Sequence, residues 1–399
     1  MLRLVSLAGL LVFVLLAWLI SEKRSGVKAR IILWGIGLQA GFAFLVLKTP
    51  AGLILFKMAG KFFGGLVFYS NKGAAFLFGT LVSDYNLGAI VAFQVLPIII
   101  FVSSIAGILY MYGIIQFIVK MFAWVMRRTM KISGLEAFLT SLFIFMGIET
   151  ITTAKKYIEK MTRSELFTMM TGFMATIATS VMAAYVSFGA SAGHLLAASI
   201  MSAPAAVVIS KIMIPETKKP LTVDENMVTY KSNDSNIVEA AANGAYDGLK
   251  LAAQVGAMLI AFVGIIFMIN GLFEYTFRIP FERVLGYVFS PFAFLMGVEY
   301  KDCLEVGRLL GTKTVFNEFL AYLNMGGMIK QGLLSERSVV IATYALCGFS
   351  NFGSIAIMIG GVGALAPSRK KEVAALGLKA LVSGTLACFM TACIAGILI

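Results

Sequence analysis

Residues 347–362, CGFSNFGSIAIMIGGV, are apolar enough to lie in a membrane, yet they open near a Gly-Phe pair and are interrupted by small polar side chains. Residues 171–181, TGFMATIATSV, have the same character. Each stretch follows an apolar segment that holds a carboxylate, Glu149 before the first and Glu318 before the second. Corresponding broken spans in two halves of a chain are typical of an inverted-repeat membrane protein with its site near the bilayer midplane.

The whole chain is strongly apolar. Hydrophobic residues make up 59% of the 399 residues and charged residues only 13%, whereas a soluble domain carries about 25% charged residues. Helices of about 20 apolar residues cross the hydrocarbon core of a bilayer. We expect eight such spans, at residues 4–20, 31–47, 89–112, 169–189, 195–213, 251–273, 339–362 and 376–399. The predicted fold class is an all-α polytopic membrane protein.

The net charge of +13 comes from lysines and arginines that cluster between the apolar runs. Such clusters mark the cytoplasmic ends of spans, so we interpret them as topology signals and not as a nucleic-acid surface. All of them fall on one side if the eight spans alternate in direction. This arrangement predicts a multi-pass protein of the cell membrane with both termini outside, and it makes residues 215–235 a cytoplasmic linker.

The first apolar run has the length of a signal-peptide core, but no small-x-small cleavage site follows it and its charges come mainly after it. We therefore interpret it as a retained span. We divide the chain into an N-terminal scaffold part, residues 1–132, and two repeat halves, residues 133–275 and 276–399.

Three further apolar segments do not fit simple spans. Residues 51–81 are rich in glycine and contain three lysines, which favours an amphipathic helix lying in the membrane interface. Residues 135–158 and 292–323 are interrupted by glycine and threonine, and the second is predicted to break at Gly311-Thr-Lys-Thr. Because each holds one of the two carboxylates, we predict a pair of re-entrant hairpins that enter from opposite sides.

Glu149 and Glu318 are the strongest indications of a functional site. A carboxylate at membrane depth costs a few kcal/mol on insertion scales, so it normally faces a cavity or a partner. The competing interpretation is that each one lies at the interface or caps a helix end. Their occurrence in matching halves favours a site.

Asn351 and Ser354 lie three residues apart and share one face of a helix. Gly348 and Gly353 favour an unwound turn beside them. Polar groups in membrane spans often only bond to neighbouring helices. Together with Glu318, however, an amide and a hydroxyl suit a ligand with vicinal hydroxyl groups, such as ribose.

Phe349 and Thr176 each allow a functional and a structural interpretation. Phe349 can offer an aromatic face to a planar ring, although most phenylalanines in spans only pack. Thr176, beside Gly172 and Thr179, can help to coordinate a small hard cation through oxygen atoms, or it can serve helix packing.

Few residues suit enzymatic chemistry. His194 is the single histidine, and the four cysteines have no CxxC spacing, which argues against a hydrolytic triad, a zinc site and a disulfide framework. The alternatives to a transporter are a membrane enzyme that uses Glu149 and Glu318 as an acid–base pair, and a solute channel.

Long stretches of the chain resemble the concentrative nucleoside transporter family. They are FLFGTL (76–81), VLPIIIFVSSIAGILYMYG (95–113), MTRSELFTMMTGFMATIATSVMAAY (161–185), TKTVFNEFLAYL (312–323) and residues 347–387. The NEF and GF-x-N-x-x-S motifs are specific. The resemblance implies eight spans, two re-entrant hairpins and an interfacial helix in a homotrimer. It also implies import of nucleosides on a Na⁺ or H⁺ gradient, with no cofactor.

The resemblance implies roles for individual residues. Glu318, Asn351 and Ser354 would bind the ribose hydroxyls. Phe349 and Val181 would border the base, with Glu149 near it at the tip of the first hairpin. The coupling cation would be held by the Thr176 hydroxyl and by the carbonyls of Leu142, Phe145, Thr176 and Ile177.

One departure from the family concerns the first hairpin. The family usually has Gly-Gln-(Ser/Thr)-Glu there, whereas this chain has Met146-Gly147-Ile148-Glu149. Gly147 and Ile148 therefore lack the side-chain groups that would address the base. An ionised Glu149 can only accept hydrogen bonds, which favours bases that present donors. This pattern favours purine nucleosides.

Overall fold

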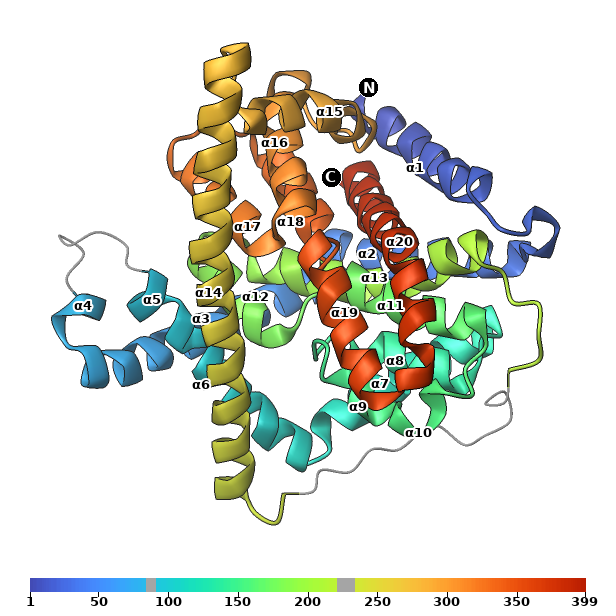
Figure 1. The fold of residues 1–399 in the computed structure, drawn as a ribbon, viewed down its shortest axis with the longest axis horizontal. Coiled ribbons are helices and arrows are strands. Elements are labelled where there is room, and N and C mark those ends of the chain that lie inside the picture. Colours follow the sequence, from blue (N-terminus) through green and yellow to red (C-terminus); the bar gives the residue numbers. More distant parts are fainter. Residues whose placement is uncertain (84–90, 221–233) are drawn as a thin grey trace.

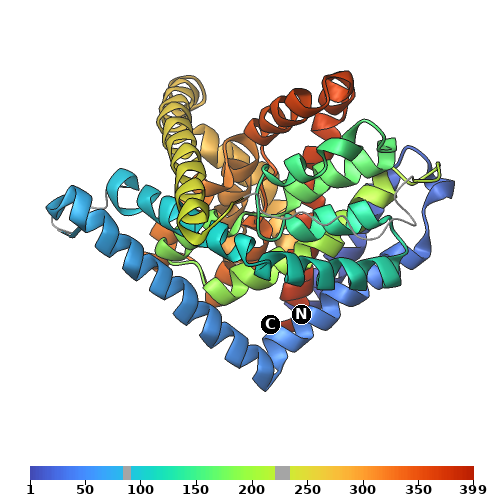
Figure 2. The same cartoon turned by 90° about the horizontal axis from the view of Figure 1, so that it is seen from below.

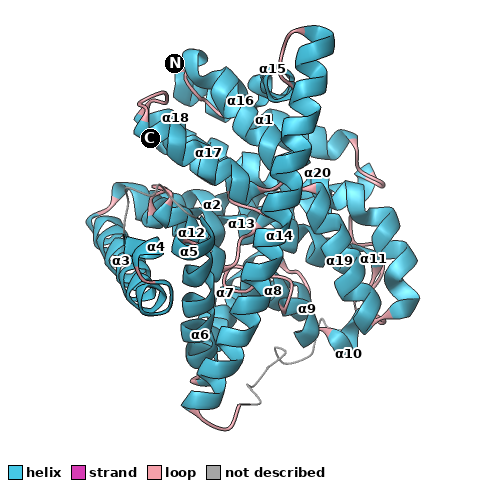
Figure 3. Ribbon diagram, turned by 60° about the vertical axis from the view of Figure 1, so that its left-hand side comes forward, coloured by secondary structure: helices cyan, strands magenta, loops and turns pink. Residues whose placement is uncertain are grey.

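The computed structural model describes residues 1–83, 91–220 and 234–399. In these residues the chain forms α-helices and short 3-10 turns and no strand (Figure 3). Eight helices of this described part are long and apolar enough to cross a membrane. The predicted all-α class is therefore confirmed.

In the N-terminal part, α2 (Ala29–Lys48) and α3 (Pro50–Phe78) meet at a sharp corner at Thr49, visible as the two arms of a V in Figure 2. At this corner the Thr49 hydroxyl accepts the Gly52 N–H at 3.2 Å, and Pro50 takes the first helical position, where no N–H is needed. The helices of this part are α1 (Leu2–Leu19), α2 (Ala29–Lys48), α3 (Pro50–Phe78), α4 (Thr80–Ser83), α5 (Val91–Gln94), α6 (Leu96–Met111) and α7 (Ile114–Met130).

Helix α3 corresponds to the predicted interfacial helix at 51–81, and its position in the interface stays a prediction. The predicted span 89–112 corresponds to α5 and α6, although its first two residues lie outside the described part. The linker prediction at 215–235 also falls largely outside it, including Lys231.

The first repeat half has two helices that start in the same way. At α8, Ser133 and Glu136 form a capping box, in which the Ser133 hydroxyl accepts the Glu136 N–H and the Glu136 carboxylate accepts the Ser133 N–H. At α11, Thr162 and Glu165 repeat this arrangement. The helices of this half that precede residue 220 are α8 (Gly134–Leu142), α9 (Thr150–Thr153), α10 (Lys155–Ile158), α11 (Arg163–Ala175), α12 (Thr179–Ser187) and α13 (Ala192–Met213).

The remaining chain starts with a 41-residue helix, α14 (Ile237–Phe277), which stands as a column along one side of the molecule in Figure 1. The predicted span 251–273 is its C-terminal portion. The other helices are α15 (Phe281–Leu295), α16 (Cys303–Val315), α17 (Glu318–Lys330), α18 (Glu336–Leu346), α19 (Phe352–Leu365) and α20 (Lys370–Leu398).

Two predicted spans are broken helices. Residues 169–189 cover the end of α11 and all of α12, which are separated by residues 176–178. Residues 339–362 cover α18 and α19, which are separated by residues 347–351. Because of this second break, 339–362 is not among the eight long apolar helices, whereas α3 is. The predicted number of spans, eight, equals the number of long apolar helices in the described part, but α3 takes the place of 339–362.

The predicted break at Gly311-Thr-Lys-Thr is wrong. These four residues lie inside α16, and the chain turns at Phe316 and Asn317 instead. Asn317 begins the next helix, because its side-chain oxygen accepts the Leu320 N–H at 2.8 Å. The turn therefore lies directly beside Glu318. The re-entrant character of both hairpins stays a prediction.

Helices α11, α13 and α20 form the buried centre of the molecule, whereas α14 is largely exposed. Polar pairs link the central helices: the Thr171 hydroxyl donates to Ser383 at 3.0 Å, and the Thr168 and Ser210 hydroxyls lie 3.1 Å apart. The two chain ends lie side by side, and the Arg3 guanidinium donates to the Ile399 carbonyl at 2.7 Å (Figure 1). The side of the membrane on which the termini lie stays a prediction.

The two helix breaks meet in space. The Phe349 N–H, in the break before α19, donates to the Thr176 carbonyl, in the break before α12, at 3.2 Å. The Thr179 N–H donates to the Phe145 carbonyl of the first hairpin at 3.1 Å. Backbone groups freed from helices need partners away from water. The first of these bonds joins the two repeat halves, and the second joins the first hairpin to α12 within one half.

Candidate functional site

Glu318 lies at the start of α17 and is only 5% exposed. Its Oε1 accepts a hydrogen bond from the Tyr185 hydroxyl of α12 at 2.9 Å. Its Oε2 accepts one from the Asn351 amide at 2.9 Å. A buried carboxylate requires such partners, and these two come from both repeat halves.

Asn351 is held in place by the helix that it begins. Its side-chain oxygen accepts the Ser354 N–H at 2.8 Å and so caps α19. The amide nitrogen is then left to face Glu318, and Ser354 lies in the first turn beside it. Close packing behind this turn requires Gly348, because a Cβ there would lie 2.6 Å from the Cys388 sulfur.

A cavity of about 300 Å³ opens in front of this cluster. Its walls include all eight residues predicted to contact substrate: Gly147, Ile148, Glu149, Val181, Glu318, Phe349, Asn351 and Ser354. The Phe349 ring lies 5.4 Å from that of Phe173, centroid to centroid, which supports its orientation. The structure thus brings together residues that are more than 200 positions apart in the chain. Their roles as substrate ligands stay predictions.

The first hairpin has no bulky group at Gly147. A Cβ at this position would lie 3.0 Å from the Oε2 atom of Glu149, so the Glu149 carboxylate lies against the bare backbone of Gly147. Glu149 itself is exposed to the cavity. The Glu149 carboxylate can therefore take this position because residue 147 has no side chain.

Sequence reasoning missed the contribution of α14. One stripe of this helix lines the cavity and carries three polar side chains, Asp247, Lys250 and Gln254, together with Leu251, Val255 and Met258. The spacing of three and four residues was visible in the sequence. The predicted span began at residue 251, however, so the two charged residues fell outside it. Tyr185 was missed as well, because only the fold brings it to Glu318. Asn317 was not assigned to the site although it directly precedes Glu318 in the chain.

A second cavity, of about 450 Å³, adjoins the first. The two share wall residues, among them Gly147, Glu149 and Asp247. The second cavity continues along α14 towards its N-terminal end at Asn243 and Ala240. It thus extends from Glu149 and Asp247 towards the end of α14 that the charge rule predicts to be cytoplasmic.

The predicted cation ligands lie at the meeting point of the helix breaks. The Leu142 carbonyl accepts the N–H groups of Phe145 and Met146, each at 3.0 Å, and the Thr176 hydroxyl donates to the Gly172 carbonyl at 2.8 Å. The side chain of Ile177 is fully buried. The Leu142 carbonyl thus uses both lone pairs within the hairpin, whereas the Thr176 hydroxyl donates its proton to Gly172 and keeps its oxygen lone pairs for a cation. In the described part no three His, Cys, Asp or Glu residues cluster as a metal site.

Family models match three successive parts of the chain. The N-terminus of the Na⁺ dependent nucleoside transporters matches residues 8–81, a nucleoside recognition (gate) region matches residues 92–192, and the C-terminus of the same transporters matches residues 194–396. The chain belongs to the Na⁺ dependent nucleoside transporter family. The resemblance found in the sequence is confirmed, and the family is one of transporters and not of enzymes.

Members of this family from animals and bacteria are similar over the whole chain. Human solute carrier family 28 member 3 is 42% identical over 99% of this chain and 60% of its own length. An uncharacterized transporter of Bacillus subtilis, YutK, is 41% identical over 98% of both chains. The rat sodium/nucleoside cotransporter 1 is 38% identical over 99% of this chain and 64% of its own length. The chain thus spans about 60% of the length of its animal relatives.

Solved structures of the nucleoside transporter family agree with the fold. CNTnw in an inward-facing substrate-bound state has a TM-score of 0.95 at 37% identity, covering 100% of this chain and 99% of that one. A doubly substituted CNTnw in an outward-facing state also has a TM-score of 0.95, at 36% identity, with the same coverage. The architecture is therefore that of this transporter fold.

Proposed function

We propose that this protein is a secondary active transporter that imports nucleosides on a Na⁺ gradient, in the manner that its family membership indicates. The observation that carries the proposal is the buried carboxylate of Glu318, held by Tyr185 and Asn351 at the wall of a 300 Å³ cavity. Burying a carboxylate is costly unless it is paired or functional. No basic side chain neutralises this one within hydrogen-bonding distance in the described residues, so a ligand that brings donors would add to its stability.

The ribose of a nucleoside fits the polar end of the cavity. Its vicinal hydroxyls are donors and acceptors, so they can donate to Glu318 and exchange hydrogen bonds with Asn351 and Ser354. Hydrogen bonds to a charged group contribute about 1.5–3 kcal/mol each. This end of the site would therefore distinguish ribose from sugars without the hydroxyls.

The base fits the opposite end, between Phe349 and Val181 and close to the first hairpin. Glu149 is the polar group of the hairpin there, since Gly147 and Ile148 provide none. A carboxylate accepts from the N1–H and amino group of guanine or the N1–H of hypoxanthine. The space beside Gly147 also suits a two-ring base. We infer a preference for purine nucleosides.

The coupling cation would bind at the meeting of the two helix breaks, with oxygens of Leu142, Phe145, Thr176 and Ile177. One charge that crosses 100 mV supplies about 2.3 kcal/mol, which corresponds to about 50-fold accumulation of solute. Neutral oxygen ligands suit Na⁺, whereas H⁺ coupling would require one of the carboxylates to carry the proton.

The deciding experiment is uptake of labelled guanosine into vesicles that contain the purified protein. With an inward Na⁺ gradient, we expect accumulation above the outside concentration. With an inward H⁺ gradient alone, we expect none. A channel would equilibrate guanosine without accumulating it. Accumulation driven by an H⁺ gradient alone would mean that H⁺, and not Na⁺, is the coupling ion. Vesicles with the Glu318→Gln variant serve as the matched control.

We also propose that the protein is a homotrimer in the cell membrane with both termini outside. Helix α14 exposes large apolar side chains, such as Ile260, Phe267 and Tyr275, which must face lipid or another subunit. The mass of the complex in a neutral detergent tests the trimer. Labelling of a cysteine introduced beside Met1, with a reagent that does not cross the membrane, tests the orientation.

A further inference from the structure

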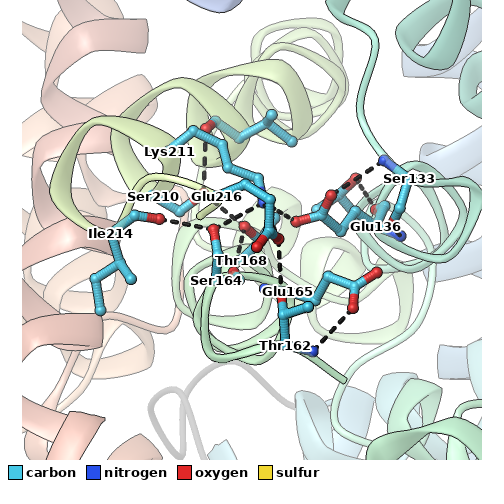
Figure 4. Close-up of polar contacts among 12 residues, drawn as sticks. Ser133, Glu136, Thr162, Ser164, Glu165, Thr168, Ser210, Lys211, Ile214 and Glu216 are labelled. Atoms are coloured by element: carbon cyan, nitrogen blue, oxygen red, sulfur yellow. Dashed lines mark hydrogen bonds and ion pairs between the residues drawn. The ribbon is translucent and has the colours of Figure 1, made fainter. Parts of the chain in front are cut away.

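A buried ionic cluster lies apart from the substrate cavity, at the end of α13 (Figure 4). Lys211 is 4% exposed and forms an ion pair with Glu136 of α8. Its ammonium group lies 3.6 Å from Glu216 and donates to the Ser164 hydroxyl of α11 at 2.8 Å. One cation is thus shared by two carboxylates and ties α8, α11 and α13 together.

The two carboxylates of this cluster are well supplied with donors. Glu136 also accepts the Ser133 N–H as part of the capping box. Glu216 accepts the Thr162 hydroxyl at 2.7 Å and the Lys218 N–H at 3.1 Å. The charge of Lys211 is therefore neutralised by its neighbours. The cluster of Lys211, Glu136 and Glu216 lines the bottom of an adjoining cavity.

That space is a third cavity, of about 330 Å³, which we call the lysine pocket. Its floor is the cluster of Lys211, Glu136 and Glu216, and its rim carries four exposed lysines: Lys28, Lys131, Lys218 and Lys219. None of these four ammonium groups has a carboxylate partner among residues 1–83, 91–220 and 234–399. Four lysines that have no carboxylate partner in the described part of the chain surround one cavity, and such a group attracts an anion with several acceptor oxygens.

The tryptophans of the chain indicate where this pocket lies. The sequence has three, and two of them, Trp34 and Trp124, lie on helices that begin or end at the pocket. Trp34 follows Lys28 by two helical turns at most, and Trp124 precedes Lys131 on α7 by a similar distance. Trp18 lies in the last turn of α1, and the segment that follows this helix brings Gly26 to the pocket wall.

These tryptophans have the surroundings of an interfacial belt. All three are more than a third exposed. The Arg24 guanidinium lies 4.9 Å from the ring centroid of Trp18, and that of Arg128 lies 5.7 Å from Trp124. Tryptophan with neighbouring arginine is typical of the level of lipid headgroups. The lysine pocket therefore opens at the membrane surface, on the side that the charge rule makes cytoplasmic.

We propose that the lysine pocket binds a phosphate-bearing anion, and that an anionic lipid headgroup is its source. A phosphate diester offers oxygens to several ammonium groups at once, and basic pockets between helices at the cytoplasmic surface suit such headgroups. The belt position favours a lipid over a soluble phosphate. A bound headgroup would bridge α2 and α7 to the start of α8, and so would hold the first hairpin half against the N-terminal part.

The test is native mass spectrometry of the purified full chain in a neutral detergent. The probes are phosphatidylglycerol, phosphatidylcholine and inorganic phosphate, each titrated separately. The pocket variant combines Lys28→Gln, Lys131→Gln and Lys218→Gln. The control variant combines Lys155→Gln, Lys156→Gln and Lys160→Gln, which removes the same charge from exposed lysines that do not line the pocket. Thermal unfolding without lipid checks that both variants are folded.

We expect phosphatidylglycerol to bind the unaltered protein and the control variant alike, and phosphatidylcholine to bind both weakly. Each lysine near a membrane surface changes anionic-lipid binding about fivefold, so the pocket variant should bind about a hundredfold more weakly. Inorganic phosphate that binds as well as phosphatidylglycerol would overturn the lipid source. Equal losses in the two variants, or none in the pocket variant, would overturn the site itself.

Discussion

The amide nitrogen of Asn351 lies 2.9 Å from the Oε2 atom of Glu318, although the two residues belong to different helices and are 33 positions apart. Each lies where a helix begins, so neither side chain has to compete with a helical neighbour for this contact. Asn351 cannot turn its amide round, because its oxygen caps α19. The donor that it presents to the carboxylate is thus determined by the fold before any ligand arrives.

The first prediction concerns Glu318→Gln, which should lower nucleoside affinity by roughly ten- to a hundredfold. The substituted amide keeps one acceptor but loses the charge that strengthens bonds from ribose hydroxyls. The measurement is uptake of labelled nucleoside at equal amounts of inserted protein. Competition by 2′,3′-dideoxynucleosides as strong as that by ribonucleosides in the unaltered protein would contradict the sugar-binding role.

The second prediction separates Tyr185 from its neighbour Tyr322. Both rings are buried and stack with centroids 4.2 Å apart. The Tyr185 hydroxyl donates to Glu318, whereas the Tyr322 hydroxyl donates to the Thr343 carbonyl at 2.7 Å. We expect Tyr185→Phe to lower nucleoside affinity about tenfold, because the hydrogen bond that holds the Glu318 carboxylate in place is lost.

Tyr322→Phe is the matched control for this change. It should lower the free energy of unfolding by about 1 kcal/mol and leave nucleoside affinity unaltered. Binding and thermal unfolding are measured on both variants. The same effect of the two substitutions on affinity would mean that Tyr185 acts through packing and not through Glu318.

The third prediction is that Thr176→Val raises the Na⁺ concentration needed for half-maximal uptake by about tenfold, with base selectivity unchanged. The hydroxyl is the only side-chain oxygen in the predicted cation site. Thr171→Val is the control, since Thr171 lies on α11, the helix that ends just before Thr176, and donates to Ser383. A Na⁺ titration curve that moves equally in both variants would count against the site.

The fourth prediction concerns the hairpin residues Gly147 and Ile148. Restoring the usual pair with Gly147→Gln and Ile148→Thr should shift competition from guanosine towards uridine. The new side chain starts 3.0 Å from the Glu149 carboxylate, so Glu149 must move by a few tenths of an ångström and changes its contact with the base. The ratio of the two competitors is the measurement, and an unchanged ratio would show that these positions do not face the base.

The fifth prediction concerns Glu22, in the turn after α1, where no membrane span is predicted. The Arg163 guanidinium donates to both Glu22 oxygens, at 3.3 and 3.0 Å, and with Lys379 it holds the pKa of this carboxyl below its ordinary value of 4.5. A lowered pKa means that the stabilisation is complete above pH 4.5 and is lost as the pH falls further.

Because the pair is partly exposed, this stabilisation is at most about 1 kcal/mol. Thermal unfolding in detergent should therefore show a difference between the unaltered protein and Glu22→Gln at pH 7 that shrinks towards pH 4. A difference that is independent of pH would contradict the assignment.

The sequence by itself determined the fold class, the positions of most spans and the identity of the substrate-cavity residues on the two hairpins and the two breaks. Apolar runs, clustered lysines and carboxylates within apolar segments each change the free energy of membrane insertion strongly, so each can be recognised from the local sequence. Glu149, Glu318, Asn351 and Ser354 were recognisable for this reason.

The tertiary structure alone decided where helices stop and which residues complete the site. The break expected at Gly311-Thr-Lys-Thr lies at Phe316 instead, since glycine and threonine are tolerated within a packed helix whereas the Asn317 cap specifies a start. Tyr185 and the polar stripe on α14 reach the cavity only because distant helices pack together. Contacts between residues far apart in the chain depend on packing, and packing has no local signature.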